Sequence, residues 1–179
     1  MKFPNFASLC ATFLLGTTAT LFLSNSTIAA EKIVLKYGPL AQSIKISDLE
    51  NFVKTGETTP TLATMLKISK QNADTVRGLM SLELGVNVLT LDRALNSKQG
   101  ETALVELGKT MRTRSRFESD KALRAALILS SADNGKLSLI EILQKYPTSE
   151  INIEVANIGA TVEKLKGLTG NLQQLLNSK

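Results

Sequence analysis

Three segments of the chain alternate between apolar and polar residues, a pattern that predicts β-strands. Residues 31–37 alternate, Gly38 and Pro39 interrupt the pattern, and residues 42–46 resume it, so these two segments predict a hairpin. Residues 150–155 alternate again. An isolated hairpin is only marginally stable, and each segment has a single apolar face. We therefore expect the third strand to return to the hairpin, giving a small antiparallel sheet with one face packed on helices.

The region between these strands has a helical pattern, with apolar side chains every three or four residues. Glycines and prolines divide it into short pieces, which favours angled helices over long rods. Ser47 and Glu50 have the spacing of a capping box, which predicts that the first helix starts there and ends at Gly56. Further helices are expected at about residues 60–66, 72–84, 88–95, 100–111, 120–132 and 138–145.

These elements predict a fold class and a domain organisation. Residues 120–132 are apolar or small almost all the way round, so this helix is expected to be the most enclosed. The predicted class is α+β: a predominantly helical small bundle with a two- to three-stranded antiparallel sheet, over residues 31–158. Residues 159–179 keep the helical spacing and are predicted to form a C-terminal amphipathic helix.

Residues 1–30 have the layout of a secretory signal peptide. Lys2 precedes an uncharged, mainly apolar stretch from about Ala7 to Leu23, and small residues lead to Ala30. This stretch is at the short end of what spans a bilayer, which favours cleavage after Ala30 over an uncleaved membrane anchor. We expect an exported protein, in the periplasm, the thylakoid lumen or the extracellular medium, with no membrane span after signal cleavage.

The residues needed for several catalytic chemistries are missing from the sequence. It contains no histidine, and its one cysteine, Cys10, lies within the predicted signal peptide. The usual general base, the usual zinc ligand and the Ser-His-Asp and Cys-His triads are therefore excluded. The nucleophile elbow G-x-S-x-G and the glycine-rich phosphate loops do not occur either. We expect no catalytic residue, no cofactor and no metal site.

Residues 130–141, SSADNGKLSLIE, resemble the outline of a calcium-binding helix-loop-helix. Ala132 places a methyl group where the third position of such a loop needs an oxygen ligand, and Glu141 is the one carboxylate at a ligand position. A turn accounts for the same residues, because Gly135 can end one helix and a capping box from Ser138 to Glu141 can start the next. The segment therefore predicts a turn between two helices.

A basic cluster lies in the polar connection before the enclosed helix. One interpretation is a contact for an anion or an acidic partner; the other, which the sequence favours, is a solvated loop paired with Glu118 and Asp120. Few aromatic residues accompany the cluster, the net charge is only +5, and export separates the chain from nucleic acid, so no nucleic-acid partner is expected. The candidate contact residues are Lys109, Arg112, Arg114 and Arg116.

Arg124 is a second candidate, because it lies inside the apolar segment ALRAALIL. A charge in that position needs a carboxylate or carbonyl partner, or a route to the surface. A buried structural ion pair is the favoured interpretation, and a contact with a ligand is the alternative.

The order of several motifs resembles that of a known family. The segments are EKIVLKYGPL, KISDLENFVKTGE, LGVNVLTLDRALNSKQGETALVELG and ALRAALILSSADNGKLSLIEILQKYPTSEINIEV. Together they resemble the N-terminal domain of unknown function of exported cyanobacterial proteins labelled α/β-hydrolases, over about residues 31–158. In larger members this domain precedes a hydrolase domain. Here the serine elbow and the histidine have no matching positions, so the resemblance implies a domain standing alone and carries over no catalytic residue.

Taken together, the residues and the resemblance lead us to expect a non-catalytic interaction or regulatory module. Its expected partner is another envelope protein, such as a separate α/β-hydrolase, bound through the tail helix or the basic residues at 109–116. One alternative is an envelope protein that binds a lipid or another small molecule in a cleft between the helices and the sheet. The other alternative is a hydrolase of unknown substrate, as the family label says.

Overall fold

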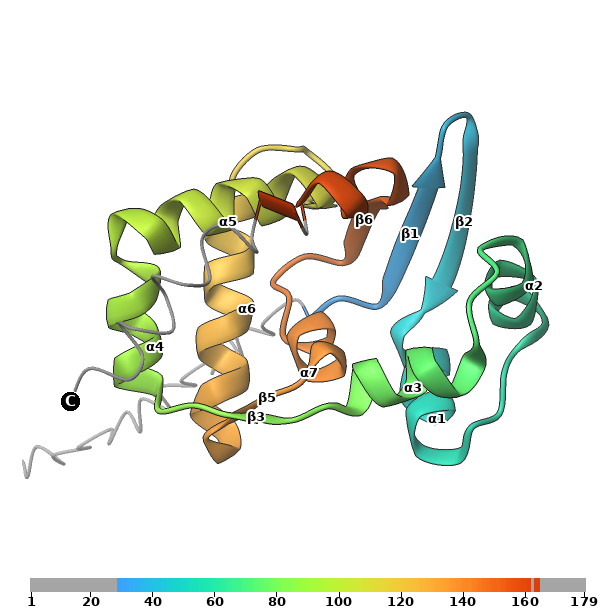
Figure 1. The fold of residues 1–179 in the computed structure, drawn as a ribbon, viewed down its shortest axis with the longest axis horizontal. Coiled ribbons are helices and arrows are strands. Elements are labelled where there is room, and N and C mark those ends of the chain that lie inside the picture. The colour runs from blue at the N-terminus through green and yellow to red at the C-terminus, as the bar shows by residue number, and fades with distance from the viewer. Residues whose placement is uncertain (1–28, 162, 165–179) are drawn as a thin grey trace, which may run out of the picture.

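The computed structural model describes residues 29–161, 163 and 164, and Figure 1 shows their fold. Strands β1 (Lys32–Tyr37) and β2 (Leu40–Lys45) pair antiparallel, so the predicted hairpin is confirmed. Gly38 at its turn has a φ of 57°, a left-handed conformation that glycine adopts without steric cost. The third predicted strand, β6 (Glu150–Glu154), returns to the hairpin and pairs with β1.

Within the described part of the chain, the main sheet has four strands in the order β2-β1-β6-β4, where β4 is Met111–Arg112. Strand β6 runs parallel to β1, with Ile33 opposite Ile151, and β4 runs antiparallel to β6. The sheet is therefore mixed, and the prediction of a purely antiparallel sheet is wrong. A parallel pair needs a long crossover, which the helical region supplies, and alternation alone does not reveal strand direction.

Each predicted helical segment between the strands contains a helix. The bounds are α1 (Ile46–Thr55), α2 (Pro60–Ile68), α3 (Ala73–Ser81), α4 (Val88–Leu95), α5 (Lys98–Thr110), α6 (Ser119–Asn134) and α7 (Leu139–Gln144). Helix α2 contacts β2 at the edge of the main sheet (Figure 1). A 3-10 turn, η1 (Val155–Asn157), follows β6. Most of the predicted tail helix and of the predicted signal peptide lies outside the described residues.

The start of α1 differs from the prediction, while its end agrees. The helix begins at Ile46 with no side-chain cap, so the predicted capping box between Ser47 and Glu50 is wrong. The Ile46 amide instead donates to the Glu31 carbonyl at 2.9 Å, and its buried side chain fixes the helix directly after β2. Gly56, with a φ of 83°, ends α1 in the left-handed conformation, as predicted.

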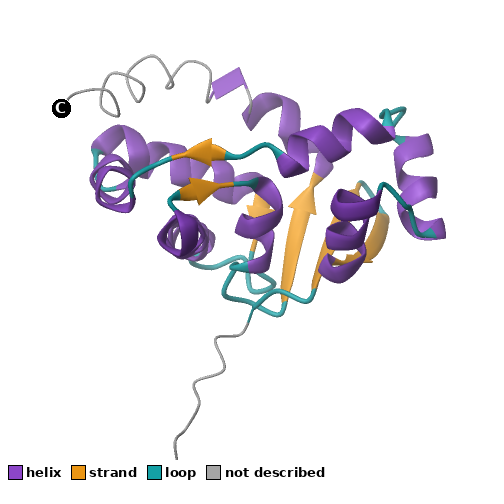
Figure 2. Ribbon diagram, turned by 90° about the horizontal axis from the view of Figure 1, so that it is seen from below, coloured by secondary structure: helices purple, strands orange, loops and turns teal. Residues whose placement is uncertain are grey.

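A second, two-stranded sheet explains why α3 is shorter than predicted. Strand β3 (Leu84–Gly85) pairs antiparallel with β5 (Lys136–Leu137), and Figure 2 shows these strands apart from the main sheet. Residues 82–84, which the sequence pattern placed at the end of this helix, are therefore not helical. Strands of two residues are too short to show alternation, so the sequence pattern did not reveal them.

The helices do not form a single small bundle, so that part of the prediction is wrong. On one side α4, α5 and α6 pack together; on the other, α1 contacts α3, and α7 contacts α1, α3 and α6 (Figure 1). Most of these helices have ten residues or fewer and bury one to three side chains each. These short helices therefore form two groups, and both groups pack against the main sheet.

Helix α6 is the most enclosed element, as predicted. Ala126 at its centre has no exposed surface, and α6 contacts α4, α5, α7, β4 and β5. Phe52, Leu104, Tyr146 and Ile151, each almost fully buried, complete the core between the two helical groups and the sheet. The fold class is therefore α+β, with one continuous core.

Two adjacent serines in α6 give a direct test of this core. Both are at most 2% exposed, but Ser131 Oγ donates to the Ile128 carbonyl at 3.0 Å, whereas Ser130 Oγ has no hydrogen-bond partner among the described residues. We expect Ser130→Ala to change the free energy of unfolding by about zero to +1 kcal/mol and Ser131→Ala to lower it by about 1 kcal/mol. Urea denaturation of both variants measures this, and an equal loss for the two would contradict it.

Candidate interaction site around a basic loop

The basic cluster predicted from the sequence lies between the end of α5 and the start of α6. We call residues 109–118 the basic loop. Thr113 and Ser119, which are 5% and 6% exposed, hold it from inside. Thr113 Oγ1 donates to the Phe117 carbonyl at 2.8 Å, and the Thr113 amide donates to Ser119 Oγ at 3.2 Å. The loop is therefore folded on two buried hydroxyl side chains.

Two non-glycine residues of the basic loop have a left-handed backbone. Arg116 has a φ of 63° and Glu118 a φ of 55°. For such residues this conformation costs about 1–2 kcal/mol each, and the hydrogen bonds of Thr113 and Ser119 offset the cost. Phe117 lies between them and is 78% exposed. The fold thus holds an aromatic side chain out of the core, in water, on a backbone fixed from both sides.

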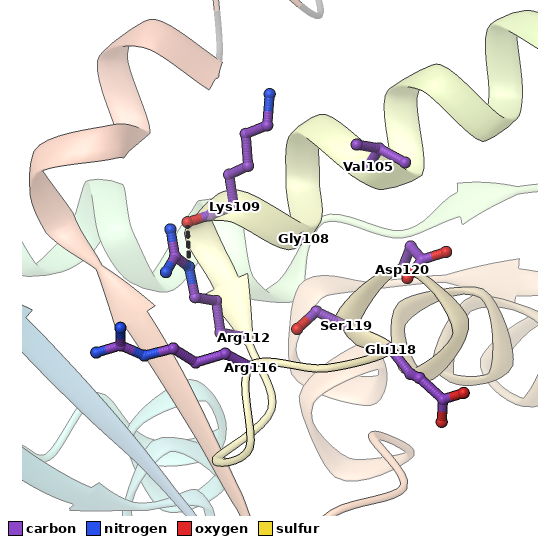
Figure 3. Close-up of a pocket in the computed structure, with 8 residues that line it drawn as sticks. All are labelled: Val105, Gly108, Lys109, Arg112, Arg116, Glu118, Ser119 and Asp120. Atoms are coloured by element: carbon purple, nitrogen blue, oxygen red, sulfur yellow. Dashed lines mark hydrogen bonds between the residues drawn. The ribbon is translucent and has the colours of Figure 1, made fainter.

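A cavity of about 220 Å³ opens between α5, the loop and the start of α6 (Figure 3). Lys109, Arg112 and Arg116 line it, so three of the four predicted cations come together. In Figure 3 the side chains of Arg112 and Arg116 both extend to the left of the view, whereas the carboxylates of Glu118 and Asp120 lie to the right. The cavity therefore separates a cationic wall from an acidic one.

Arg112 has a fixed orientation. Its Nε donates to the Lys109 carbonyl at 2.8 Å, and Asn157 Nδ2 donates to the same carbonyl at 3.0 Å. Lys109 Nζ lies 2.6 Å from Oε1 of Glu106, and the other carboxylate oxygen of Glu106 accepts from Lys164. These bonds to Lys109 and Lys164 lower the pKa of Glu106. The charge of Lys109 is thus compensated, and the outer guanidinium nitrogens of Arg112 have no hydrogen bond within the described chain.

Arg114 and Arg124 lie away from this cavity. Arg114 lies towards β6, where it adds to the hydrogen bonds from Asn152 and Lys32 that lower the pKa of Glu150. Arg124 is half-buried on α6, and its Nη1 donates to Asn96 Oδ1 at 2.6 Å. The partner of Arg124 is therefore a neutral side-chain carbonyl, and none of the salt bridges between described residues includes Arg124.

The segment 130–141 forms the predicted turn. Gly135, with a φ of 71°, ends α6, and the capping box of Ser138 and Glu141 starts α7. Glu141 Oε2 accepts from the Ser138 amide at 3.1 Å and from its hydroxyl at 2.9 Å. Among the described residues, no group of three or more His, Cys, Asp or Glu side chains is placed to hold a metal ion.

The sequence did not single out Phe117, Thr113 and Ser119. An aromatic residue within the polar run TRSRFESD was a usable signal, because such a side chain has no apolar neighbours in sequence to bury it. The left-handed residues gave no signal, since neither is glycine or asparagine. In the described ranges 29–161 and 163–164, no helix has the length and apolar character needed to cross a bilayer.

A family model described as "Alpha/beta hydrolase of unknown function (DUF1400)" matches residues 29–154. The matched range includes all strands of the main sheet, the basic loop and the core residues described above. No curated protein and no solved structure matches the chain. The resemblance seen in the order of the motifs is thus confirmed: the chain belongs to this α/β-hydrolase family of unknown function.

Proposed function

We propose that this domain is a non-catalytic interaction module that docks on another exported protein through the basic loop. One observation carries the proposal: Phe117 is 78% exposed on a loop that buried Thr113 and Ser119 hold in a costly backbone conformation. Exposed aromatic and arginine side chains are the residues that most often dominate protein–protein binding. Because the loop is already ordered, binding loses little conformational entropy.

The family description suggests the kind of partner. It joins this domain to the name α/β-hydrolase, while the chain contains neither a histidine nor a G-x-S-x-G elbow. The partner we propose is therefore an α/β-hydrolase in the same compartment, with a regulatory or positioning role for this domain.

Replacing Phe117 with alanine is expected to weaken partner binding by about thirtyfold, the loss typical of a buried aromatic anchor. Leu89→Ala is the matched control, because Leu89 is also an exposed apolar residue (65%) but lies on α4. The partner is recovered from envelope extracts with the natural chain, identified, and titrated calorimetrically against both variants. Recovery of no specific partner, or equal binding by the two variants, would refute the proposal.

A second candidate function rests on another cavity. A space of about 440 Å³ lies between α1, α6 and α7, with Ile46, Leu129 and Pro147 among its walls. This volume is in the range of small-molecule sites, so a lipid or another apolar ligand is the alternative. Native mass spectrometry of protein purified from its source separates the candidates, because it reports a bound protein, a bound small mass or the bare chain.

The third candidate is the hydrolase of the family label. Hydrolysis here would need a carboxylate or an unassisted serine as the reactive group, since the chain has no histidine. A panel of ester and peptide substrates tests this candidate, and turnover abolished by one side-chain substitution would establish it.

A further inference from the structure

Two arginines that line the cavity of the basic loop carry a recognition chemistry of their own. We propose that Arg112 and Arg116 form a carboxylate-binding pair and that the partner presents an acidic peptide segment to it. This inference rests on the proposed function and specifies the partner's chemistry. It identifies two specificity-determining residues within the basic loop.

Arg112 is prepared for such a contact. Its Nε is held by the Lys109 carbonyl at 2.8 Å, and that carbonyl is itself fixed by Asn157 at 3.0 Å. The planar guanidinium therefore has a set direction, while both outer nitrogens remain available to donate to a ligand's oxygens. A fork held in this way loses less entropy on binding a carboxylate than a freely rotating side chain.

Arg116 supplies the second cation. Its guanidinium has no hydrogen bond or salt bridge within the described part of the chain, and it lines the same cavity as Arg112. The two acidic residues that line the cavity do not neutralise the pair: Glu118 is bound to Lys121 at 2.7 Å, and Asp120 points to the other side in Figure 3. Two cations that line the same cavity repel each other, and an anion bound between them offsets that repulsion.

An acidic peptide fits this surface better than an anionic membrane. Arg116 is followed in sequence by Phe117, whose exposed ring needs an apolar pocket in a partner, and by Glu118, whose side chain is 68% exposed. A membrane surface pressed on the loop would place lipid phosphates against Glu118 and Asp120, which repel them. A folded partner can place carboxylates against the cations alone, which is how mixed charges give specificity.

The test uses the full chain and a fluorescent hexaglutamate peptide, with hexaglutamine as the uncharged comparison. Arg116→Ser is expected to weaken hexaglutamate binding about tenfold, and Arg112→Lys, which keeps the charge but loses the fork, about fivefold. Arg93→Ser is the matched control, because Arg93 is exposed on α4 and its loss changes the net charge equally. We expect its effect to stay within about twofold.

Three outcomes would overturn the inference. They are equal binding of hexaglutamate and hexaglutamine, an equal effect of Arg93→Ser and Arg116→Ser, and Arg116-dependent binding of inorganic phosphate or phosphatidylglycerol vesicles without binding of hexaglutamate. None of these outcomes changes the interpretation of the Phe117→Ala experiment with the natural partner. A Phe117-dependent partner with no hexaglutamate binding would leave the proposed function standing and remove only the carboxylate pair.

Discussion

Replacing Tyr146 with alanine is expected to lower the free energy of unfolding by about 4 kcal/mol, which places it among the most damaging core substitutions. The side chain has no exposed surface and lies directly after α7, in the core shared by the sheet and both helical groups. Its removal leaves a cavity that the fixed backbone around it cannot close. Urea denaturation followed by circular dichroism measures the loss.

Tyr146→Phe separates the ring from its hydroxyl group. The hydroxyl lies 3.4 Å from the Met111 carbonyl and 3.5 Å from the Ser119 carbonyl, so both hydrogen bonds are long. One proton shared between two distant acceptors contributes little, and we expect this variant to lose less than about 1 kcal/mol. A loss of stability as large as that of Tyr146→Ala would show that the main contribution comes from the hydroxyl group and not from the packed ring.

The same side chain predicts a loss of stability in alkaline solution. Burial, with a smaller contribution from Asp120, raises the pKa of Tyr146 from 10.0 to about 12. The folded chain therefore keeps a proton that the unfolded chain releases, so this contribution is complete below pH 10 and is lost as the pH rises towards 12. The slope approaches about 1.4 kcal/mol per pH unit. The difference in slope between the natural chain and Tyr146→Phe isolates this contribution, and equal slopes for the two would contradict it.

Replacing Gly100 with alanine is expected to destabilise the domain by about 2 kcal/mol, although alanine is the better helix former. Gly100 lies in the first turn of α5, where Ser97 Oγ accepts from its amide at 3.1 Å. An added Cβ would overlap the carbonyl oxygen of Ala94 and lie 2.7 Å from Leu95 Cα. These are backbone atoms of α4, so the two helices would have to separate.

Gly78 provides the matched control for this substitution. It lies inside α3, and an added Cβ there would meet nothing within 4 Å. Gly78→Ala should therefore raise the free energy of unfolding by about 0.5–1 kcal/mol, because it restricts the unfolded chain without a clash. Thermal and urea unfolding of both variants are compared. If Gly100→Ala also stabilises the domain, the close approach of α4 and α5 does not constrain the fold.

The sequence located most elements of this fold because their signals are local. Alternation placed both hairpin strands and β6, and Gly56 and Gly135 marked two helix ends. The errors concern relations between distant segments. Nothing local distinguishes a parallel from an antiparallel return of β6, and the role of Gly100 depends on a close contact with α4 that its position at a helix start does not reveal.

For the candidate site, too, the sequence identified single residues but not their arrangement in space. Composition and spacing identified the cations of the basic loop, because charge is a property of single residues. Which cations share a cavity depends on the path of the loop backbone, which is left-handed at Arg116 and Glu118; Arg112 and Arg116 line the cavity, while Arg114 interacts with Glu150. The exposure of Phe117 also depended on that backbone, which no propensity scale anticipates.

The parallel pairing of β1 with β6 sets the order in which the domain is completed. Strand β1 can pair with β6 only when residues 150–154 have been synthesised, so the main sheet cannot close before the whole helical region between them has been made. Contacts between such distant segments also slow folding. The main sheet is therefore the last part of this domain to be completed, after the helices that connect its strands.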